Sequence, residues 1–408
     1  MKKLLLIAAF LLSLTNLKLL DPVGVDAVIT PFLIIAFPMA IYYFAHGIRM
    51  RSARSDYGPW LISAYIFFVS LMHYQDARWS SVALFMVYLG FFGFVRGRTF
   101  LIERRDIEKL SKLIITVYFV NVISALLVFK VSGSHLAPWL FQVYDQGVRL
   151  RYQGFSSEPS YASFVVCISL FAYLNLNAES SRKNIFWIIL VAILMVFFQS
   201  VYGYILFVAC VSIFISRGSS ARYLKLVFIV IGGLSVTLLL LSLDLLYEPD
   251  NSRLIGIFHT IYSTGFNLDS LHNEDSSAYM RVGPSFSYIF SPQFYSVNGV
   301  FGYGPGSARH FFGTEFSDVI AQGQRGYEEG VISLGLLPSF LYEYGIVGFG
   351  LMAWLIVRRS IGRLATLSGF LVLLASFNAN LNTQMFCFTV IMLCFSSKIS
   401  ARKLDHEA

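Results

Sequence analysis

Long apolar runs recur along this chain of 408 residues and restrict its fold more than any other feature. A helix that crosses a bilayer needs roughly 17–25 predominantly apolar residues. We therefore predict an all-α polytopic membrane protein with about twelve transmembrane helices, of which the seventh and eighth are joined by a tight turn in the sequence QSVYGY. The apolar runs lie near residues 4–20, 27–46, 58–74, 80–95, 112–131, 159–176, 184–200, 201–216, 224–243, 332–357, 363–378 and 383–397.

Composition agrees with this fold class. Charged residues make up 13% of the chain, whereas soluble domains carry about 25%. The cysteines lie inside apolar runs and form neither a CxxC pair nor a Cys/His cluster, so we expect packing residues rather than disulfides or a zinc site. These cysteines are Cys167, Cys210, Cys387 and Cys394.

The distribution of Lys and Arg predicts the orientation. If the N-terminus is cytoplasmic, that side carries 22 Lys and Arg and the other side nine. Cytoplasmic loops are enriched in these residues, so we expect both termini in the cytoplasm. The net charge of +8 then reflects topology and does not predict nucleic-acid binding. Residues 1–20 could instead be a signal peptide, although no clear small-x-small cleavage site follows them.

This topology divides the chain into four parts. Residues 1–243 hold nine transmembrane helices and an outer loop at about 132–158, and residues 244–331 form a large outer loop. Residues 332–397 hold the last three helices, and residues 398–408 form a cytoplasmic tail. The other outer loops are short, so we expect function on the outer face, in the two longer loops.

Arginines stand out in these two loops. The large loop contains four arginines, ten Asp and Glu and no lysine, so it is not a general basic patch for anionic lipid. Arginine stays charged, and its planar fork binds phosphate through two hydrogen bonds. We expect at least two outer arginines to bind phosphate, the alternative being that each pairs with a loop carboxylate. The candidates are Arg149, Arg151, Arg253, Arg281, Arg309 and Arg325.

The large loop also contains the sequence GYGPG at Gly302–Gly306, here called the glycine motif. No strand–helix unit with dinucleotide-binding spacing surrounds it. Glycines allow positive φ and close approach of a ligand, so exposed amides could form an anion-binding nest. A tight turn explains the motif equally well. The candidate substrate-binding residues here are Gly302, Tyr303, Gly304 and Gly306.

Polar residues also gather in RYQGFSSEPSYASF, residues 151–164, where the sixth helix should begin. Pro159 suits the first turn of a helix, and the helix dipole favours the carboxylate of Glu158 before it. A structural role therefore suffices for Glu158. In the alternative, Glu158 accepts a proton from a hydroxyl, while Arg151 keeps it ionised or binds phosphate. Gly154 lets the chain turn between the two residues.

The pattern R-x-x-G-x-x-x-E-P-S at residues 151–160 resembles the Wzy-type bacterial polysaccharide polymerases. The stretch from Arg281 to the glycine motif resembles the large periplasmic loop of the same superfamily, and LPSFLYEYGIVGFG at 337–350 resembles the helix that follows. In the related O-antigen ligases, a His-Asn pair opens that helix. Here Leu334 and Gly335 stand at that place, which favours a polymerase over a ligase.

The resemblance implies a reaction at the periplasmic face of the bacterial inner membrane. A glycan on undecaprenyl diphosphate is transferred to a lipid-linked repeat unit, in O-antigen, capsule or exopolysaccharide biosynthesis. Arginines would stabilise the departing diphosphate. No cofactor, nucleotide sugar or metal is expected, and the sequence has no D-x-D motif. Membrane lipid and a chain-length regulator are candidate partners.

The general base has several candidates. Glu158 is our first choice and His310 the second, because an imidazole can exchange protons near neutral pH; Glu328 and Glu329 follow. Glu343 lies inside an apolar run and is interpreted as a structural or cavity-facing contact. The predicted catalytic set is Glu158, Arg151, Arg281 and His310.

A transporter, such as a flippase of lipid-linked oligosaccharide, is the main alternative. Twelve spans with cytoplasmic termini fit that class, but a carrier commonly shows two similar halves with binding at the midplane. This sequence shows no internal repeat, and its polar residues gather outside the apolar runs.

Overall fold

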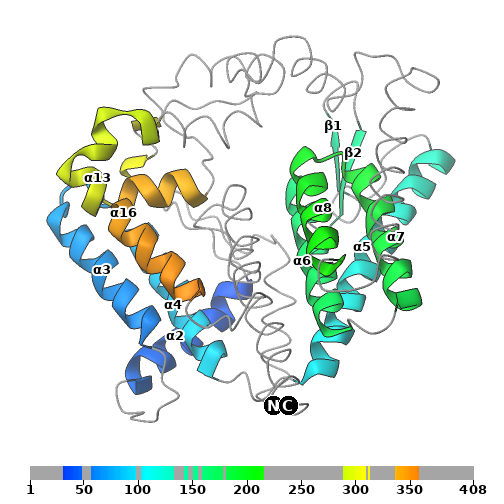
Figure 1. Ribbon diagram of the computed structural model, residues 1–408, viewed down its shortest axis with the longest axis horizontal. Coiled ribbons are helices and arrows are strands. Elements are labelled where there is room, and N and C mark those ends of the chain that lie inside the picture. Colours follow the sequence, from blue (N-terminus) through cyan, green and yellow to red (C-terminus); the bar gives the residue numbers. More distant parts are fainter. Residues whose placement is uncertain are drawn as a thin grey trace. The chain divides into compact units, whose positions relative to one another are not determined.

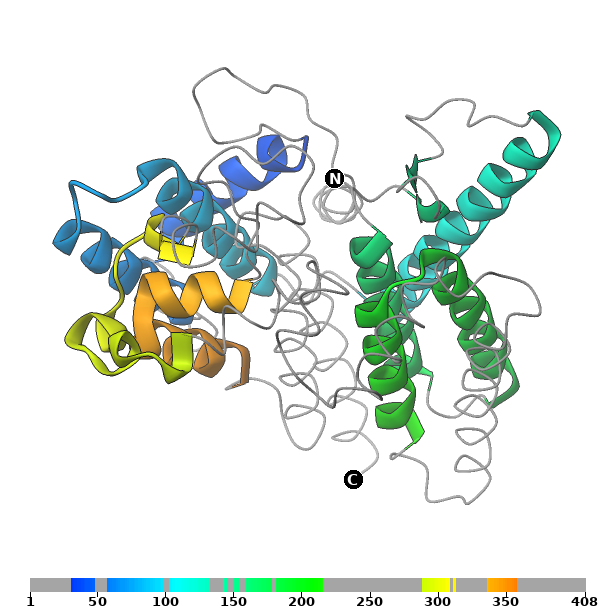
Figure 2. The same cartoon turned by 90° about the horizontal axis from the view of Figure 1, so that it is seen from above.

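The described part of the chain forms two compact units in the computed structural model (Figures 1 and 2). One unit is built from residues 1–102 and 276–394, and the other from residues 103–275 and 395–408. We call them unit 1 and unit 2 and describe each by itself. The residues described are 31–47, 57–97, 103–132, 142–145, 150–154, 159–177, 181–215, 288–308, 311–312 and 336–357.

Helices account for most of the described residues, as the apolar runs predict. Eight predicted runs coincide with helices: α2 (Pro31–Gly47), α3 (Gly58–Met72), α4 (Trp79–Gly97), α5 (Arg104–Ser132), α6 (Pro159–Leu176), α7 (Ser181–Phe198), α8 (Val201–Ile215) and α16 (Leu336–Val357). The runs near 4–20, 224–243, 363–378 and 383–397 lie outside the described residues. The mostly helical fold is therefore confirmed for this part of the chain.

Length and composition identify one membrane-span candidate among the described helices, the segment Arg104–Val128 of α5. The other apolar helices do not meet this test, because their fully described stretches, seven in all, are 10–17 residues long. The structure contains no membrane, so twelve spans stay a prediction.

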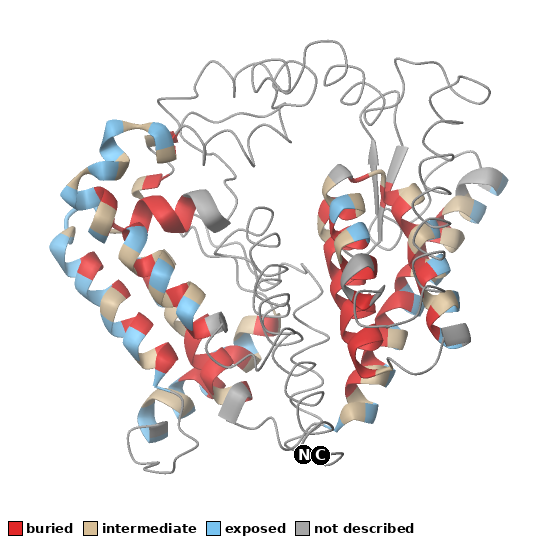
Figure 3. Cartoon of the chain, viewed as in Figure 1, coloured by how far each residue is buried: buried red, intermediate tan, exposed pale blue. Residues whose placement is uncertain are grey.

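In unit 1, α2 and α4 pack closely because α4 presents glycines to α2. A Cβ added to Gly90 would lie 2.7 Å from the Cβ of Ala40, and one added to Gly93 would meet the ring of Tyr43. Small residues of this kind let helix backbones approach one another. The rings of Phe32 and Phe91 then meet edge to face, with centroids 5.1 Å apart. Figure 3 shows buried residues on the facing sides of these helices.

The helix α16 of unit 1 is broken at Gly345. This residue has φ 67° and ψ −176°, a region that only glycine occupies without strain. The chain therefore changes direction within α16, as Figure 1 shows for the orange ribbon. The backbone at the break packs against a short helix, α13 (Val297–Phe301). A Cβ added to Gly345 would collide with the Val300 carbonyl oxygen of α13.

Unit 2 joins α5, α6, α7 and α8 to an antiparallel hairpin. The hairpin consists of β1 (Gln142–Asp145) and β2 (Leu150–Gly154). β2 packs against α5, α6 and α7, and the buried ring of Tyr152 meets Phe197 of α7 edge to face at 5.8 Å. Among the described residues the hairpin is the departure from an all-α chain. It lies within the predicted outer loop at 132–158.

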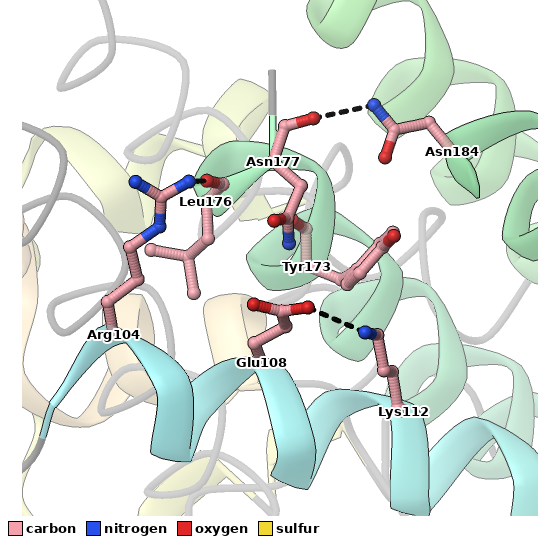
Figure 4. A network of polar contacts seen from close by, with 7 residues as sticks. All are labelled: Arg104, Glu108, Lys112, Tyr173, Leu176, Asn177 and Asn184. Carbon is pink, nitrogen blue, oxygen red and sulfur yellow. Dashed lines mark hydrogen bonds and ion pairs between the residues drawn. The ribbon is translucent and has the colours of Figure 1, made fainter. Parts of the chain in front are cut away.

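The opposite end of unit 2 is tied together by polar side chains (Figure 4). The Arg104 guanidinium, in the first turn of α5, donates a hydrogen bond to the carbonyl of Leu176 at the end of α6. The side chain of Asn184 in α7 donates to the carbonyl of Asn177 at 2.6 Å. The last carbonyls of a helix have no partner within it, so these side chains satisfy them and hold the register of three helices.

A polar ladder continues this contact along α5. The Lys112 ammonium lies 2.6 Å from the Glu108 carboxylate, one turn earlier, and 5.3 Å from the ring centroid of Tyr173 in α6. Glu108 and Lys112 thus form an ion pair on the side of α5 that contacts α6. Only Gln199 and Ser200 separate α7 from α8, which agrees with the predicted tight turn.

Substitution of Gly345 by Ala tests the break. The new Cβ would need a backbone region that costs about 1–3 kcal/mol in a non-glycine residue, and it would collide with the Val300 carbonyl. We expect a lower temperature of thermal unfolding for the detergent-solubilised protein. Gly350→Ala is the matched control, since no atom lies within 4 Å of its added Cβ. Equal unfolding temperatures for the two variants would contradict the described break.

Candidate functional site

The structure describes five of the predicted site residues. Arg151 lies in β2, where its backbone alone is described, and Gly302, Tyr303, Gly304 and Gly306 are described in unit 1. The others lie outside the described residues: Glu158, Arg281, His310, Arg149, Arg253, Arg309 and Arg325. Their roles stay predictions.

The segment that resembles the polymerase pattern runs from a strand into a helix. Arg151 pairs with Tyr144 across the hairpin, and β2 ends at Gly154. The helix α6 begins at Pro159, at the predicted position. Since a helix N-terminus carries partial positive charge, an anion close to Pro159 would be stabilised there. The strand and the helix therefore fix both ends of the four residues between Gly154 and Pro159.

The start of α6 is closely packed against α8. Ser160 and Ser163 are buried, and a Cβ added to Gly203 would lie 2.5 Å from the Ser163 side chain. The thiol of Cys167 lies 3.7 Å from the Gly203 carbonyl. This packing against α8 fixes the position of the first turns of α6.

The glycine motif in unit 1 forms a left-handed turn against α16. Gly302, Gly304 and Gly306 have φ of 104°, 93° and 93°. The amide of Tyr303 donates to the Tyr342 carbonyl at 3.1 Å, and the amide of Gly304 donates to the Glu343 carbonyl at 3.0 Å. With the Gly302 amide bonded to Asn298, three of the four N–H groups are used within the protein. The geometry thus supports the tight-turn alternative; substrate contact at this motif stays a prediction.

The acceptors of these hydrogen bonds are carbonyls that the helix break sets free. Residues before Gly345 cannot receive the usual intrahelical donors from beyond it. Tyr342 and Glu343 bond to the glycine motif, and the Tyr344 carbonyl accepts from the Tyr65 hydroxyl of α3 at 2.9 Å. The same hydroxyl lies 2.8 Å from the Phe301 carbonyl. The break, the glycine motif and α3 therefore form one hydrogen-bonded joint.

The rest of the motif rests on the turn between α3 and α4. A Cβ on Gly304 would lie 2.7 Å from the Cβ of His73, and a Cβ on Gly306 would lie 2.7 Å from that of Arg78. The Arg78 amide also donates to the Pro305 carbonyl at 2.9 Å. These contacts of His73 and Arg78 were not predicted. No local signal could have predicted them, because more than 200 residues separate the two residues from the motif.

A stack of aromatic rings covers the joint. The Tyr342 ring lies between Tyr303, with centroids 4.6 Å apart at 9°, and Phe311, with centroids 4.5 Å apart at 11°. Tyr288 meets Tyr342 at 5.0 Å, and its hydroxyl is buried without a hydrogen-bond partner in the described structure. Burial, followed by the nearby Tyr303 and Tyr342, raises the pKa of Tyr288. The rings thus brace the joint.

Glu343 is the single charged side chain that is buried among the described residues, with 8% exposure. Its position inside an apolar run predicted a structural or cavity-facing contact, and it lies two residues before the break. A buried carboxylate needs compensating contacts. The backbone of Glu343 also contacts the glycine motif, because its carbonyl accepts a hydrogen bond from the Gly304 amide.

Comparisons with family models, with curated proteins and with solved structures find no match to this chain. Among the residues that the structure describes, no group of three His, Cys, Asp or Glu could hold a metal ion.

Substitution of Tyr65 by Phe tests the joint. The carbonyls of Phe301 and Tyr344 would lose the hydroxyl donor that they share, and a hydrogen bond contributes about 0.5–1.5 kcal/mol to stability. We expect a lower unfolding temperature for Tyr65→Phe. The matched control is Tyr57→Phe, because the Tyr57 side chain is 63% exposed. If both variants unfold at the wild-type temperature, the Tyr65 hydroxyl does not support the break.

Proposed function

We propose that this chain is a polysaccharide polymerase of the bacterial inner membrane, with about twelve spans and both termini in the cytoplasm. It transfers a glycan from undecaprenyl diphosphate to a lipid-linked repeat unit at the periplasmic face. The observation that carries the proposal is the pattern at residues 151–160, which enters α6 from β2. Arg151 and Pro159 lie on regular elements, which suits a segment that positions a substrate.

The proposed chemistry needs charge stabilisation and one proton acceptor. The acceptor hydroxyl oxygen attacks the anomeric carbon of the growing glycan, and the bond from that carbon to the diphosphate oxygen breaks. The electron pair leaves with undecaprenyl diphosphate, whose charge Arg151 and Arg281 would stabilise. The hydroxyl proton passes to a base, for which Glu158 and then His310 are the candidates. The N-terminus of α6 at Pro159, which follows Glu158 in the sequence, would add partial positive charge to the proposed site.

The remaining outer arginines and the glycine motif complete the proposed substrate site. Arginine suits a diphosphate better than lysine, since its fork binds two oxygens at once. The candidates are Arg149, Arg253, Arg309 and Arg325. Within the glycine motif, Tyr303 stacks on Tyr342, and aromatic faces also suit sugar rings.

A flippase is the second candidate function, and one structural observation favours it. Transporters commonly bind substrate where a transmembrane helix is interrupted, and α16 is interrupted at Gly345. The freed carbonyls of Tyr342, Glu343 and Tyr344, however, are hydrogen-bonded within the protein. This use of the carbonyls weighs against an open ion or substrate site at the break.

Substitution of the two central arginines tests the site. We expect Arg151→Ala and Arg281→Ala each to slow polymerisation about 100-fold or more, the usual loss when one transition-state donor is removed. Arg151→Lys should also stay well below wild type, because the two-pronged contact is lost. Chain length is read from surface polysaccharide, and protein levels are read by immunoblot. Lys130→Ala, an outer cation outside both motifs, is the control. Normal chains in either Ala variant would remove that arginine from the site.

Chelation tests the absence of a metal from the mechanism. Arginines supply the charge stabilisation in our proposal, so purified protein with lipid-linked repeat should form polymer at an unchanged rate in EDTA. The same reaction with added Mg²⁺ is the comparison. Loss of polymer in EDTA and recovery with Mg²⁺ would contradict the proposed chemistry.

A further inference from the structure

The large outer loop contains one stretch that is unlike the rest. Residues 282–308, between Arg281 and Arg309, are 27 residues without Asp, Glu, Lys or Arg. All ten acidic residues and all four arginines of the loop lie outside this stretch. A loop surrounded by water has no reason to exclude charge over such a length. Charge is costly, by contrast, where a chain contacts the apolar part of a bilayer.

The structure shows that this stretch presents apolar side chains outward. The described part before the glycine motif, residues 288–301, contains η3 (Pro292–Tyr295) and α13, and we call it the interface segment. Four of its large side chains are exposed: Phe290 by 75%, Tyr295 by 72%, Val297 by 73% and Phe301 by 43%. Its other side, with Tyr288 and Gly299, is buried in unit 1. The segment therefore has one packed face and one uncovered aromatic face.

Hydrogen bonds fix the level of this segment along α3. The Tyr65 hydroxyl, which binds the Phe301 carbonyl, belongs to a residue seven positions before Met72, about 10 Å along the helix axis. A tyrosine side chain is shorter than that distance, so Phe301 lies beside α3 and not beyond its end. The glycine motif then passes His73 and Arg78, which follow the end of α3 that is predicted to be outermost.

The exposed face of α3 is itself apolar at this level. Phe67, Phe68, Leu71 and Met72 are all exposed in the last two turns of the helix. In a membrane protein such a surface faces lipid. Phe301, whose carbonyl accepts a hydrogen bond from the Tyr65 hydroxyl of α3, adds an exposed ring of the interface segment at this level.

We propose that the interface segment, residues 288–301, inserts its aromatic face into the boundary between lipid headgroups and acyl chains on the outer side of the membrane. A Tyr side chain suits this boundary because its apolar ring and polar hydroxyl meet both environments, and Phe side chains suit its acyl side. The inference rests on the proposed outer location of the loop. It goes beyond the proposed function by placing the glycine motif at headgroup level, where a lipid diphosphate would lie.

Site-directed labelling tests this placement. All four cysteines are replaced by Ala, and single cysteines are introduced as Val297→Cys, Gln75→Cys or Leu71→Cys. Gln75 is exposed in the turn after α3, beside Asp76, and is the water control, whereas Leu71 on α3 is the lipid control. The protein is reconstituted in phosphatidylethanolamine–phosphatidylglycerol vesicles. One measurement is the rate of reaction with a membrane-impermeant maleimide, and the other is quenching of an attached fluorophore by lipids that carry a nitroxide near the headgroup.

We expect Val297→Cys to react at least about tenfold more slowly than Gln75→Cys, a ratio equivalent to about 1.4 kcal/mol. Its fluorophore should be quenched by the nitroxide lipids as strongly as that at Leu71. Fast reaction without quenching would place the segment in water and overturn the inference. Slow reaction without quenching would show that protein, such as a second copy, covers the face, which also overturns it. Both readouts are independent of polymerase activity, so failure of the proposed function leaves this test intact.

Discussion

The break in α16 at Gly345 is the constraint on which the joint between α3, α13 and the glycine motif depends. It leaves the carbonyls of Tyr342, Glu343 and Tyr344 without helical donors, and buried carbonyls must find others. The glycine motif and the Tyr65 hydroxyl supply them. Close approach of two backbones at this point requires residues without a Cβ, which explains Gly302 and Gly345 together. The glycine motif is thereby attached to α16 by backbone hydrogen bonds from Tyr303 and Gly304.

In unit 2, strand pairing and side-chain packing hold the segment that contains Arg151. The segment with Arg151 is a strand of a hairpin, and Tyr152 packs this strand against α7 through Phe197. At the other end of α6, the Arg104 side chain donates to the Leu176 carbonyl and holds α5 against α6. All three stretches that resemble polymerase motifs are thus built, in part or in full, into regular, packed structure. That arrangement suits catalysis by positioning and charge, since positioned groups gain most when their support does not move.

Apolar run length was sufficient to predict eight helices, and Pro159 marked the start of α6 because proline suits the first helical turn. The hairpin was missed, since two short strands carry little signal beside runs of bilayer length. The break was missed because LYEYGIVG reads as a continuous apolar helix and a glycine within it gives no sign of its φ. The bond from Tyr65 to Phe301 spans 236 positions and has no local pattern. Glu158, Arg281 and His310 lie outside the described residues, so their roles stay predictions from the sequence.

The central claim, that the chain polymerises lipid-linked repeat units on the outer face, is tested most directly by the surface polysaccharide of a deletion strain. Length-resolved electrophoresis of that polysaccharide separates single repeats from long chains. Our account predicts that long chains disappear while a single repeat remains attached, and that the wild-type gene restores the long chains. Loss of every repeat, including the single one, would contradict the account and indicate a flippase or a ligase instead.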